Sequence, residues 1–226
     1  MIDLPLIRKV AATGKPMIMS TGNANLGEIE EAVAAARASG AKDIVLLHCT
    51  SGYPTPKSQA KISTMTVMRN AFGVEVGLSD HTMDIGVSVA AVAMGACVIE
   101  KHFTLARADG GTDSAFSLEK EELKSLVTNC NMAFETIGTP NFISTEVEMQ
   151  TKVHRRSLYM VKDIKKGEVF TEEHVRSIRP GNGILPKYLD DVIGCLATED
   201  LTLGTPMRFD YYQSPEIIKK QITTSM

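Results

Sequence analysis

Residues 74–104, VEVGLSDHTMDIGVSVAAVAMGACVIEKHFT, contain two short apolar runs with a helical pattern between them. These runs are Val74 to Leu78 and Cys97 to Lys101, and two similar runs occur earlier, at Pro16 to Ser20 and Asp43 to His48. Near-continuous apolar runs of this length are typical of strands buried on both faces, as in a parallel sheet. Their separation of roughly 20 to 30 residues is that of βα units. The sequence therefore predicts an α/β fold with four parallel strands.

Helical patterns accompany these strands. Apolar residues of helical spacing occur at 4–10, at 29–36 and, after the last strand, at 123–137. Ser117 is predicted to cap the last helix, and Gly138 is predicted to end it.

Four βα units leave the fold open to two interpretations. A (β/α)8 barrel needs eight units, and an open four-stranded sheet would leave its edges and an apolar interior uncovered. The chain also opens within a helical pattern, with no strand before it. The sheet is therefore either a small doubly wound one or the C-terminal half of a longer TIM barrel.

The pattern changes near residue 141. From Arg155 onward, short β-like pieces such as SLYMV (157–161) and EVF (168–170) are separated by turn signals, which predicts a small β-rich module. The expected organisation is a partial barrel domain at 1–140, a linker at 141–154, the β-rich module at 155–213 and a frayed polar tail at 214–226.

Composition restricts the class of protein. The chain has 226 residues, of which 43% are hydrophobic and 23% charged, with a net charge of −3, so nothing favours nucleic-acid binding. No apolar run approaches the roughly 20 residues that span a bilayer, and the N-terminus lacks the order of a signal peptide. Four cysteines occur without a Cys-x-x-Cys pair, which predicts reduced, mostly buried thiols in a cytoplasmic protein: Cys49, Cys97, Cys130 and Cys195.

Two histidines follow consecutive predicted strands. His81 ends GLSDH and His102 ends VIEKH, so both should lie at the carboxyl ends of neighbouring parallel strands, where α/β folds place their sites. Adjacent strands are about 4.8 Å apart, so two imidazoles there can reach one divalent ion. A single histidine at a strand end is more often an ordinary residue, but the equivalent placement of two favours a metal site.

Hydroxyl side chains occur at the same predicted edge of the sheet. Ser20 follows the first strand, Ser51 and Tyr53 follow the second, and Ser79 lies just before the first of the two histidines. Each loop alone can be explained by helix capping, but together they indicate a site for a polar anionic ligand.

Asp113 and Arg179 have two possible interpretations. Asp113 lies in a glycine-containing loop after His102, where it either binds hydroxyl or amide groups of a substrate or is a solvated turn residue. Arg179 precedes a Pro-Gly-Asn-Gly turn of the small module and is suited to bidentate contact with a carboxylate, although a surface arginine is usually only solvated.

Several motifs resemble the sialic acid synthase family, whose members join a TIM barrel to a C-terminal antifreeze-like (SAF) domain. The similar runs are STG (20–22), LLHCTSGYPTP (46–56), GLSDHT (77–82), GACVIEKHFTL (95–105), RRSL (155–158) and KGE (166–168). Within the family, GGTDSAFSLE (110–119) and SIRPGNGILPKY (177–188) look most like the pseudaminic acid synthases, rather than the N-acetylneuraminate or legionaminate synthases. The resemblance covers about residues 1–212.

The resemblance implies a condensation of phosphoenolpyruvate with an open-chain amino sugar, here 2,4-diacetamido-2,4,6-trideoxy-altrose, to a nonulosonic acid and phosphate. It also implies that His81 and His102 hold Mn²⁺ or Mg²⁺, which acts as a Lewis acid on the sugar aldehyde. His81, His102 and Asp113 are the catalytic residues that this resemblance implies.

The resemblance assigns substrate contacts as well. Ser20 and Ser79 would bind phosphoenolpyruvate, Ser51 and Tyr53 would line the site, and Asp113 would hold the sugar. Ser51 stands where the neuraminate branch tends to carry asparagine, which favours the pseudaminate branch. Arg179 matches an arginine that reaches into the partner protomer's site, which implies a domain-swapped, head-to-tail homodimer.

One departure from the family outweighs the others. The first four strands of the family's barrel, with lysines that bind phosphoenolpyruvate, have no counterpart in this sequence. Loss of such phosphate ligands removes transition-state stabilisation, so we expect the chain to be inactive alone. Two alternatives remain: a non-catalytic half-barrel that pairs with another chain, and a small doubly wound, metal-dependent hydrolase, for which the loops supply no evident nucleophile elbow.

Overall fold

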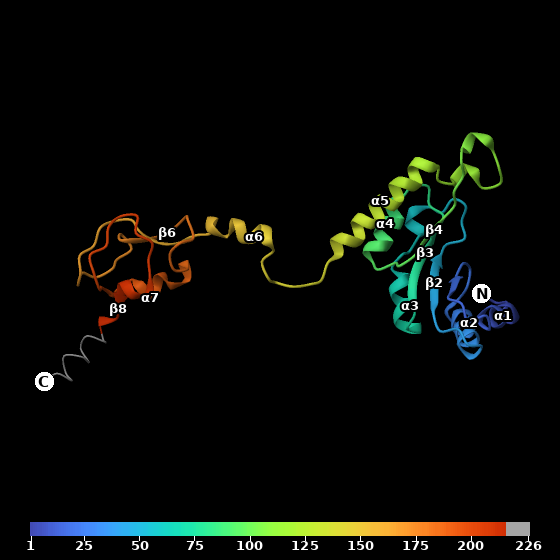
Figure 1. Ribbon diagram of the computed structural model, residues 1–226, viewed down its shortest axis with the longest axis horizontal. Helices are drawn as coiled ribbons and strands as arrows, with labels where there is room; N and C mark the ends of the chain where they lie inside the picture. Colours follow the sequence, from blue (N-terminus) through green and yellow to red (C-terminus); the bar gives the residue numbers. More distant parts are fainter. Residues whose placement is uncertain (216–226) are drawn as a thin grey trace. The chain divides into compact units, whose positions relative to one another are not determined.

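The computed structural model describes residues 1–215, which belong to two compact units, Met1–Pro140 and Asn141–Met226 (Figure 1). The first unit alternates helices and strands. Its elements are α1 Leu4–Ala11, β1 Met17–Ser20, α2 Leu26–Ala38, β2 Ile44–Cys49, α3 Thr64–Phe72, β3 Glu75–Asp80, α4 Gly86–Ala93, β4 Ile99–Lys101 and α5 Lys120–Ile137, with 3-10 helices at Lys57–Gln59, Arg107–Asp109 and Ser114–Phe116.

The four strands of the first unit form one parallel sheet in the order β1-β2-β3-β4. A doubly wound sheet reverses its strand order at a switch point, whereas sequential order is that of a (β/α) barrel. The register pairs Met17 with Ile44, Leu46 with Val76 and Asp80 with Lys101. The prediction of a barrel half followed by a β-rich unit is therefore confirmed, and the doubly wound alternative is excluded.

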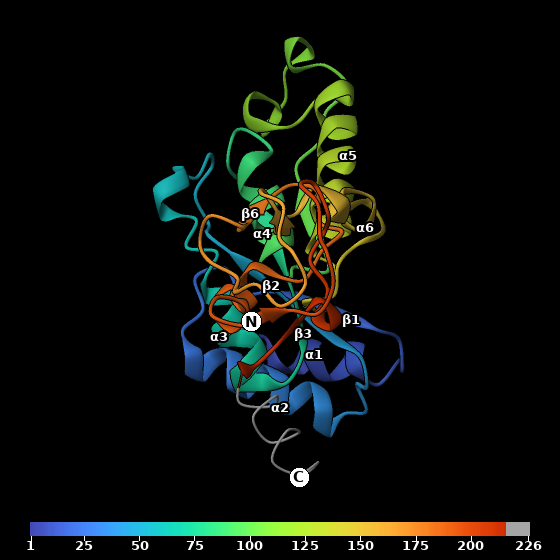
Figure 2. The ribbon, with the colours of Figure 1, turned by 90° about the vertical axis from the view of Figure 1, so that its left-hand side faces the viewer.

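The core of the first unit lies between the sheet and its helices. Because side chains alternate along a strand, Met19, Leu46 and Val76 share the face that packs against the helices. The amphipathic helix predicted around residues 29–36 is α2, whose apolar stripe is buried. Helix α1 lies beside α2, and α5 lies beside α4 (Figures 1 and 2). The helices thus cover the outer face of the sheet.

The prediction of burial on both faces is wrong for β1. Its residues alternate between buried and exposed, and Ile18 is 57% exposed on the face opposite the helices. The strand lies at an edge of the sheet, and within residues 1–215 no further strand pairs with that edge. The inner face of the sheet is therefore open at this edge.

The predicted cap of the last helix is also wrong. Helix α5 begins at Lys120 after the N-cap Glu119, which forms a capping box with Glu122. The Ser117 hydroxyl instead donates a hydrogen bond to the Asp113 carbonyl. The reason is the next residue, Leu118, whose N–H bonds the His102 carbonyl and thereby holds this segment extended beside β4. Gly138 does end the helix, with a φ of 57° that suits glycine.

In residues 141–215, the second unit consists of short strands joined by short helices and turns. Its elements are α6 Glu146–Thr151, β5 Ser157–Met160, β6 Val175–Ile178, α7 Leu189–Val192, β7 Leu196–Ala197 and β8 Tyr212–Gln213, with 3-10 helices at Lys152–His154, Pro186–Tyr188 and Phe209–Tyr211. Strands β5 and β6 pair antiparallel, as do β7 and β8, around a core that includes Leu158, Phe170 and Met207. The predicted strand EVF is wrong, because Val169 makes only an isolated bridge to Leu196.

Some sequence predictions concern the linker, the tail and the cysteines. The segment 141–154 carries α6 and a 3-10 helix, and residues 216–226 of the predicted tail lie outside the described part of the chain. All four cysteines are free, as predicted, but none is fully buried and Cys97 is exposed. Among residues 1–215, no helix is both long enough and apolar enough to cross a membrane.

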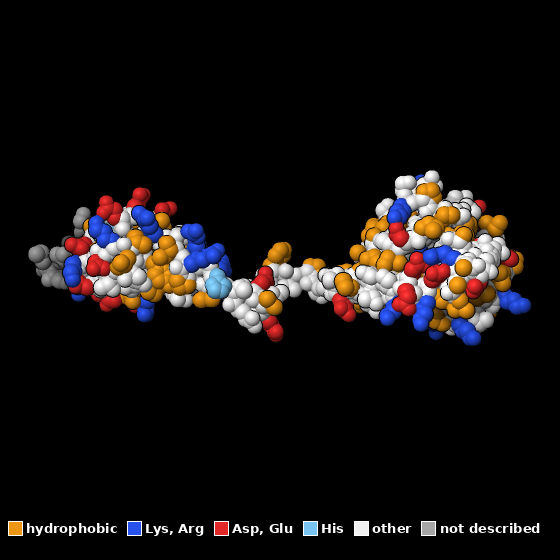
Figure 3. All heavy atoms as spheres, turned by 90° about the horizontal axis from the view of Figure 1, so that it is seen from above, with side chains coloured by type: hydrophobic (Ala, Val, Ile, Leu, Met, Phe, Trp, Pro, Cys, Tyr) orange, Lys and Arg blue, Asp and Glu red, His pale blue; other side chains and the backbone are white. Residues whose placement is uncertain are grey.

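Both units carry apolar side chains on their surfaces, interspersed with charges of both signs (Figure 3). On α5, Val127, Met132 and Phe134 are exposed. These side chains form an apolar surface on α5 that could pack against a further element.

His48 is expected to make the stability of the first unit depend on pH. Its imidazole is buried, and Nε2 lies 2.7 Å from the Ala60 carbonyl oxygen. Burial lowers the pKa of His48 below its usual value of 6.5, because the imidazolium would lose its hydration. As the pH falls through 6.5, the unfolded chain therefore binds a proton that the folded unit does not. The free energy of unfolding should then decrease by up to about 1.4 kcal/mol per pH unit.

Thermal unfolding between about pH 8 and pH 5.5 measures this effect. His48→Gln keeps an N–H donor for the Ala60 carbonyl but does not ionise, so it should reduce the loss of stability in acid. The same pH dependence in both proteins would show that His48 contributes none of it.

Candidate active site

The two histidines come together at the carboxyl ends of β3 and β4. His81 directly follows Asp80, the last residue of β3, and His102 directly follows Lys101, the last residue of β4. The centroids of the two imidazole rings are 5.2 Å apart, at an interplanar angle of 60°. The parallel pairing of Asp80 with Lys101 produces this proximity, because each histidine is the first residue after its strand.

A backbone contact orients the His81 ring. Its Nδ1 lies 3.0 Å from the Thr50 carbonyl oxygen, and the residue is 7% exposed. A carbonyl oxygen only accepts hydrogen bonds, so Nδ1 carries the proton and the lone pair of the neutral ring lies on Nε2. A carbonyl that accepts a hydrogen bond from the other ring nitrogen fixes the tautomer of many histidines that bind metals.

Two aromatic side chains surround the histidines. The ring of Tyr53 lies 4.3 Å from His81 and 5.9 Å from His102, measured between centroids. Phe116 lies 5.1 Å from His102 and 5.7 Å from Tyr53. Sequence reasoning missed Phe116, although it stands three residues after Asp113 in the same loop. The four rings form one cluster that restricts how the imidazoles can turn.

Ser79 faces the same side of the sheet as the histidines. It is 4% exposed, and its hydroxyl donates a 2.7 Å hydrogen bond to the Glu100 carboxylate. The two residues are register partners in β3 and β4. Sequence reasoning missed Glu100; the alternation of side chains along VIEKH, applied together with the strand register, would have placed it beside Ser79.

Ser20 is the last residue of β1, and Ser51 lies in the loop after β2. Both are exposed, and a Cβ added at Gly22 would lie 2.5 Å from the Ser51 hydroxyl oxygen. The loop after β1 therefore touches the loop after β2, and a side chain at position 22 would displace the Ser51 hydroxyl. The loop that follows Ser20 therefore lies next to Ser51.

Asp113 lies at the outer side of the cluster. It is exposed, and its Oδ2 is 3.7 Å from His102 Nδ1, which is too far for a hydrogen bond. The carboxylate is thus close enough to act on His102 through its charge while it remains accessible to a ligand.

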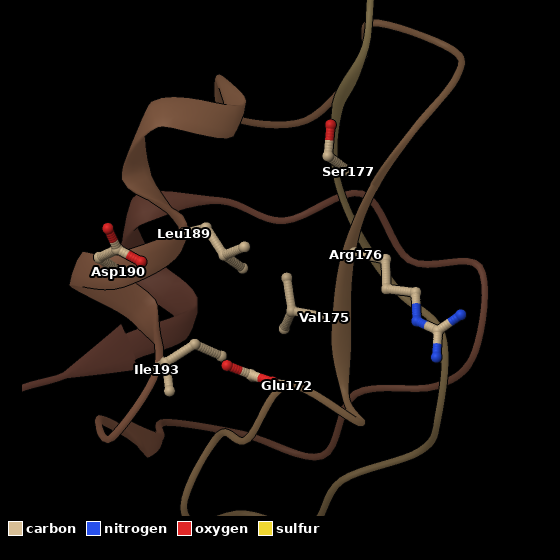
Figure 4. A pocket seen from close by; sticks show the side chains of 7 residues that line it. All are labelled: Glu172, Val175, Arg176, Ser177, Leu189, Asp190 and Ile193. Atoms are coloured by element: carbon tan, nitrogen blue, oxygen red, sulfur yellow. The ribbon is translucent and has the colours of Figure 1, made fainter.

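Arg179 belongs to the second unit, where it is exposed and precedes a cis proline. One hollow of that unit lies between β6 and α7, and the side chains of Val175, Leu189 and Ile193 point toward one another within it (Figure 4). Arg176 directs its guanidinium away from these apolar residues. None of the residues predicted to bind substrate lines this hollow.

His81 and His102 suit a divalent ion that takes only two of its ligands from the protein. Two imidazoles lie side by side, and the His81 tautomer leaves Nε2 available as a ligand. Within residues 1–215, no three histidine, cysteine, aspartate or glutamate side chains are arranged to hold a metal. Water or substrate oxygens would have to supply the other ligands, as in catalytic sites that keep open positions.

A parallel sheet in barrel order, with imidazoles and hydroxyls at the carboxyl ends of its strands, defines the class of (β/α)-barrel proteins. Within that class, the chain belongs to the NeuB family, whose model matches residues 1–141, and a SAF domain model matches residues 155–210.

Individual relatives agree with this assignment. The N,N'-diacetyllegionaminic acid synthase of Campylobacter jejuni is 44% identical over 88% of this chain and 60% of its own length. A pseudaminic acid synthase of C. jejuni is 38% identical over 91% of this chain and 60% of its own length. The crystal structure of the N-acetylneuraminic acid synthetase of Leptospira borgpetersenii, in complex with citrate, is 32% identical with a TM-score of 0.61, over 66% of this chain and 52% of that chain. The chain thus spans about three-fifths of the length of the curated relatives it matches.

Proposed function

We propose that the chain carries the metal-binding and sugar-binding part of a nonulosonic acid synthase, which condenses phosphoenolpyruvate with an open-chain amino sugar. The observation that supports this most is the pair of adjacent imidazoles, His81 and His102, beside Ser79 at the carboxyl edge of a NeuB-family sheet. Relatives named as legionaminic and pseudaminic acid synthases support the same reaction class.

In this proposal, carbon 3 of phosphoenolpyruvate attacks the sugar aldehyde. Water then adds at carbon 2, and the tetrahedral intermediate loses phosphate. A divalent ion, Mn²⁺ or Mg²⁺, held by His81 and His102, supplies Lewis acidity toward the aldehyde oxygen. Phosphoenolpyruvate is bound by Ser20 and Ser79.

The remaining residues orient the sugar. Tyr53 and Ser51 line the site, and the exposed Asp113 carboxylate accepts hydrogen bonds from sugar hydroxyl or amide groups. The Tyr53 and Phe116 rings contact the imidazoles and limit how they turn. Arg179 of the SAF domain would contact the site of a partner protomer in a head-to-tail dimer.

For the sugar, we propose 2,4-diacetamido-2,4,6-trideoxy-altrose, the substrate of the pseudaminate branch. The run GGTDSAFSLE and the serine at position 51 support this branch. The 44% identity to a legionaminic acid synthase favours the legionaminate branch as a second candidate. Comparison of kcat/KM for the two sugars decides between them, and we expect the altrose derivative to be preferred.

The proposal includes a requirement for further barrel units. In residues 1–215 the parallel sheet has four strands and open outer edges, and Ile18 and Phe134 are exposed. A closed barrel has eight strands, and the inner face of this sheet needs the other four to form a site closed to water.

Measurement of phosphate release tests both the proposed reaction and the requirement for further barrel units. The chain with Mn²⁺, phosphoenolpyruvate and the sugar should release little phosphate alone. It should gain activity when co-expressed with the portion of the C. jejuni legionaminic acid synthase that the match leaves uncovered. Omission of the sugar is the control. Full turnover by the chain alone would overturn the requirement for further units, and no turnover together with no Mn²⁺ binding would contradict the function.

A further inference from the structure

A buried ion pair lies directly behind the two histidines. Lys101 Nζ is 2.9 Å from Asp80 Oδ2, and the two side chains are only 3% and 1% exposed. Each residue immediately precedes a histidine, and Asp80 and Lys101 are register partners across β3 and β4. Because side chains alternate along a strand, this pair points toward the helices while the histidines belong to the opposite face.

The pair is the centre of a hydrogen-bond network. Asp80 Oδ2 also accepts a 2.6 Å bond from the Ser88 hydroxyl of α4, and Oδ1 accepts a 2.8 Å bond from the Thr82 N–H. Lys101 Nζ donates a second bond of 2.7 Å to the Thr82 carbonyl. The network therefore joins β3, the loop after His81, the first turn of α4 and strand β4.

Stability alone is a weak reason for such a pair. Removing two charges from water costs about as much as their attraction returns, and apolar residues of similar size often replace buried pairs without loss of stability. The best-attested use of a buried polar pair is to specify register.

The placement of His102 depends on the register of β4 against β3. The strand has three residues, Ile99–Lys101, and pairs with β3 through three register partners. A slip by one residue would turn His102 to the other face of the sheet, since the side-chain period of a strand is two. A lysine that must meet Asp80 and the Thr82 carbonyl at once allows one alignment of the two strands.

We propose that Asp80 and Lys101 are positioning residues, which fix the register of β4 against β3 and thereby hold His81 and His102 at the separation that a shared divalent cation needs. This inference rests on the proposed function, because that proposal supplies the metal ion. The placement of the two rings can be measured without any metal.

The test uses the full chain and the variant Asp80→Asn/Lys101→Met, which removes both charges and keeps the approximate size and the acceptor for Thr82. In the parent, nuclear Overhauser contacts between the ring protons of His81 and His102 are expected. The variant should lose these contacts and bind Mn²⁺ about tenfold or more weakly, as measured by electron paramagnetic resonance. The matched control, Lys57→Met/Asp84→Asn, removes an ion pair that is 65% and 47% exposed and should change neither measurement.

The outcomes separate the two hypotheses. If the variant is folded and retains both the ring contacts and the parent affinity, the positioning role is overturned. If the parent does not bind Mn²⁺, the proposed function fails, and the ring contacts alone decide the positioning role. If the double variant does not fold, Lys101→Arg is measured instead. Its planar guanidinium keeps the charge but not the short contacts to both Asp80 and Thr82, so unchanged ring contacts there would also overturn the proposal.

Discussion

Replacement of His81 or His102 by alanine is expected to lower the affinity of the chain for Mn²⁺ by at least about 100-fold, because each variant removes one of the two protein ligands that we propose. The two imidazoles lie 5.2 Å apart between centroids, and the Thr50 carbonyl holds the His81 ring so that its Nε2 is free. In the co-expressed enzyme, the same substitutions should abolish phosphate release, since the Lewis acid for the aldehyde would be lost. Electron paramagnetic resonance titration measures the affinity directly.

His154→Ala is the matched control for this experiment. His154 lies in a 3-10 helix of the second unit, outside the cluster of Tyr53, His81, His102 and Phe116. The His154→Ala variant should bind Mn²⁺ with the same affinity as the parent. Retention of the parent affinity by folded His81→Ala would show that the metal, if bound, is held elsewhere.

The second large effect concerns the fold. Gly77→Ala is expected to destabilise the first unit by about 3 kcal/mol or more, because the new Cβ has no space. It would lie 2.4 Å from the Val98 carbonyl oxygen and 2.6 Å from Leu47 Cδ2. That carbonyl accepts the hydrogen bond of the Leu78 N–H, so its displacement would separate β4 from β3.

Hydrogen exchange followed by mass spectrometry measures this effect peptide by peptide. Peptides of β3 and β4 should lose protection, while those of β5 and β6 in the second unit serve as an internal reference. Gly27→Ala is the control: it lies near the start of α2, its added Cβ would meet only Asn25 Oδ1 at 3.4 Å, and alanine favours helix. Equal protection in the two variants would contradict the prediction.

Several site features could be read from the sequence because they depend on local patterns. The alternation within VEVGLSDH and CVIEKH places Ser79, His81 and His102 at one edge of a parallel sheet, and no distant contact is needed for that inference. The cap at Ser117 was wrong for the opposite reason. A serine near a helix start is a local signal, but the pairing of Leu118 with His102 and Phe103, just after β4, overrides it.

The sequence by itself determined four parallel strands, the edge of the sheet that carries the polar side chains, and the β-rich unit that follows, because apolar periodicity and turn residues act over a few positions. The tertiary structure alone decided the His81 tautomer, the contact of Phe116 with His102, and the buried Asp80–Lys101 pair. These contacts join residues that are far apart along the chain, so they depend on strand register and on the paths of the loops. Neither is encoded in the spacing of residues within any one segment.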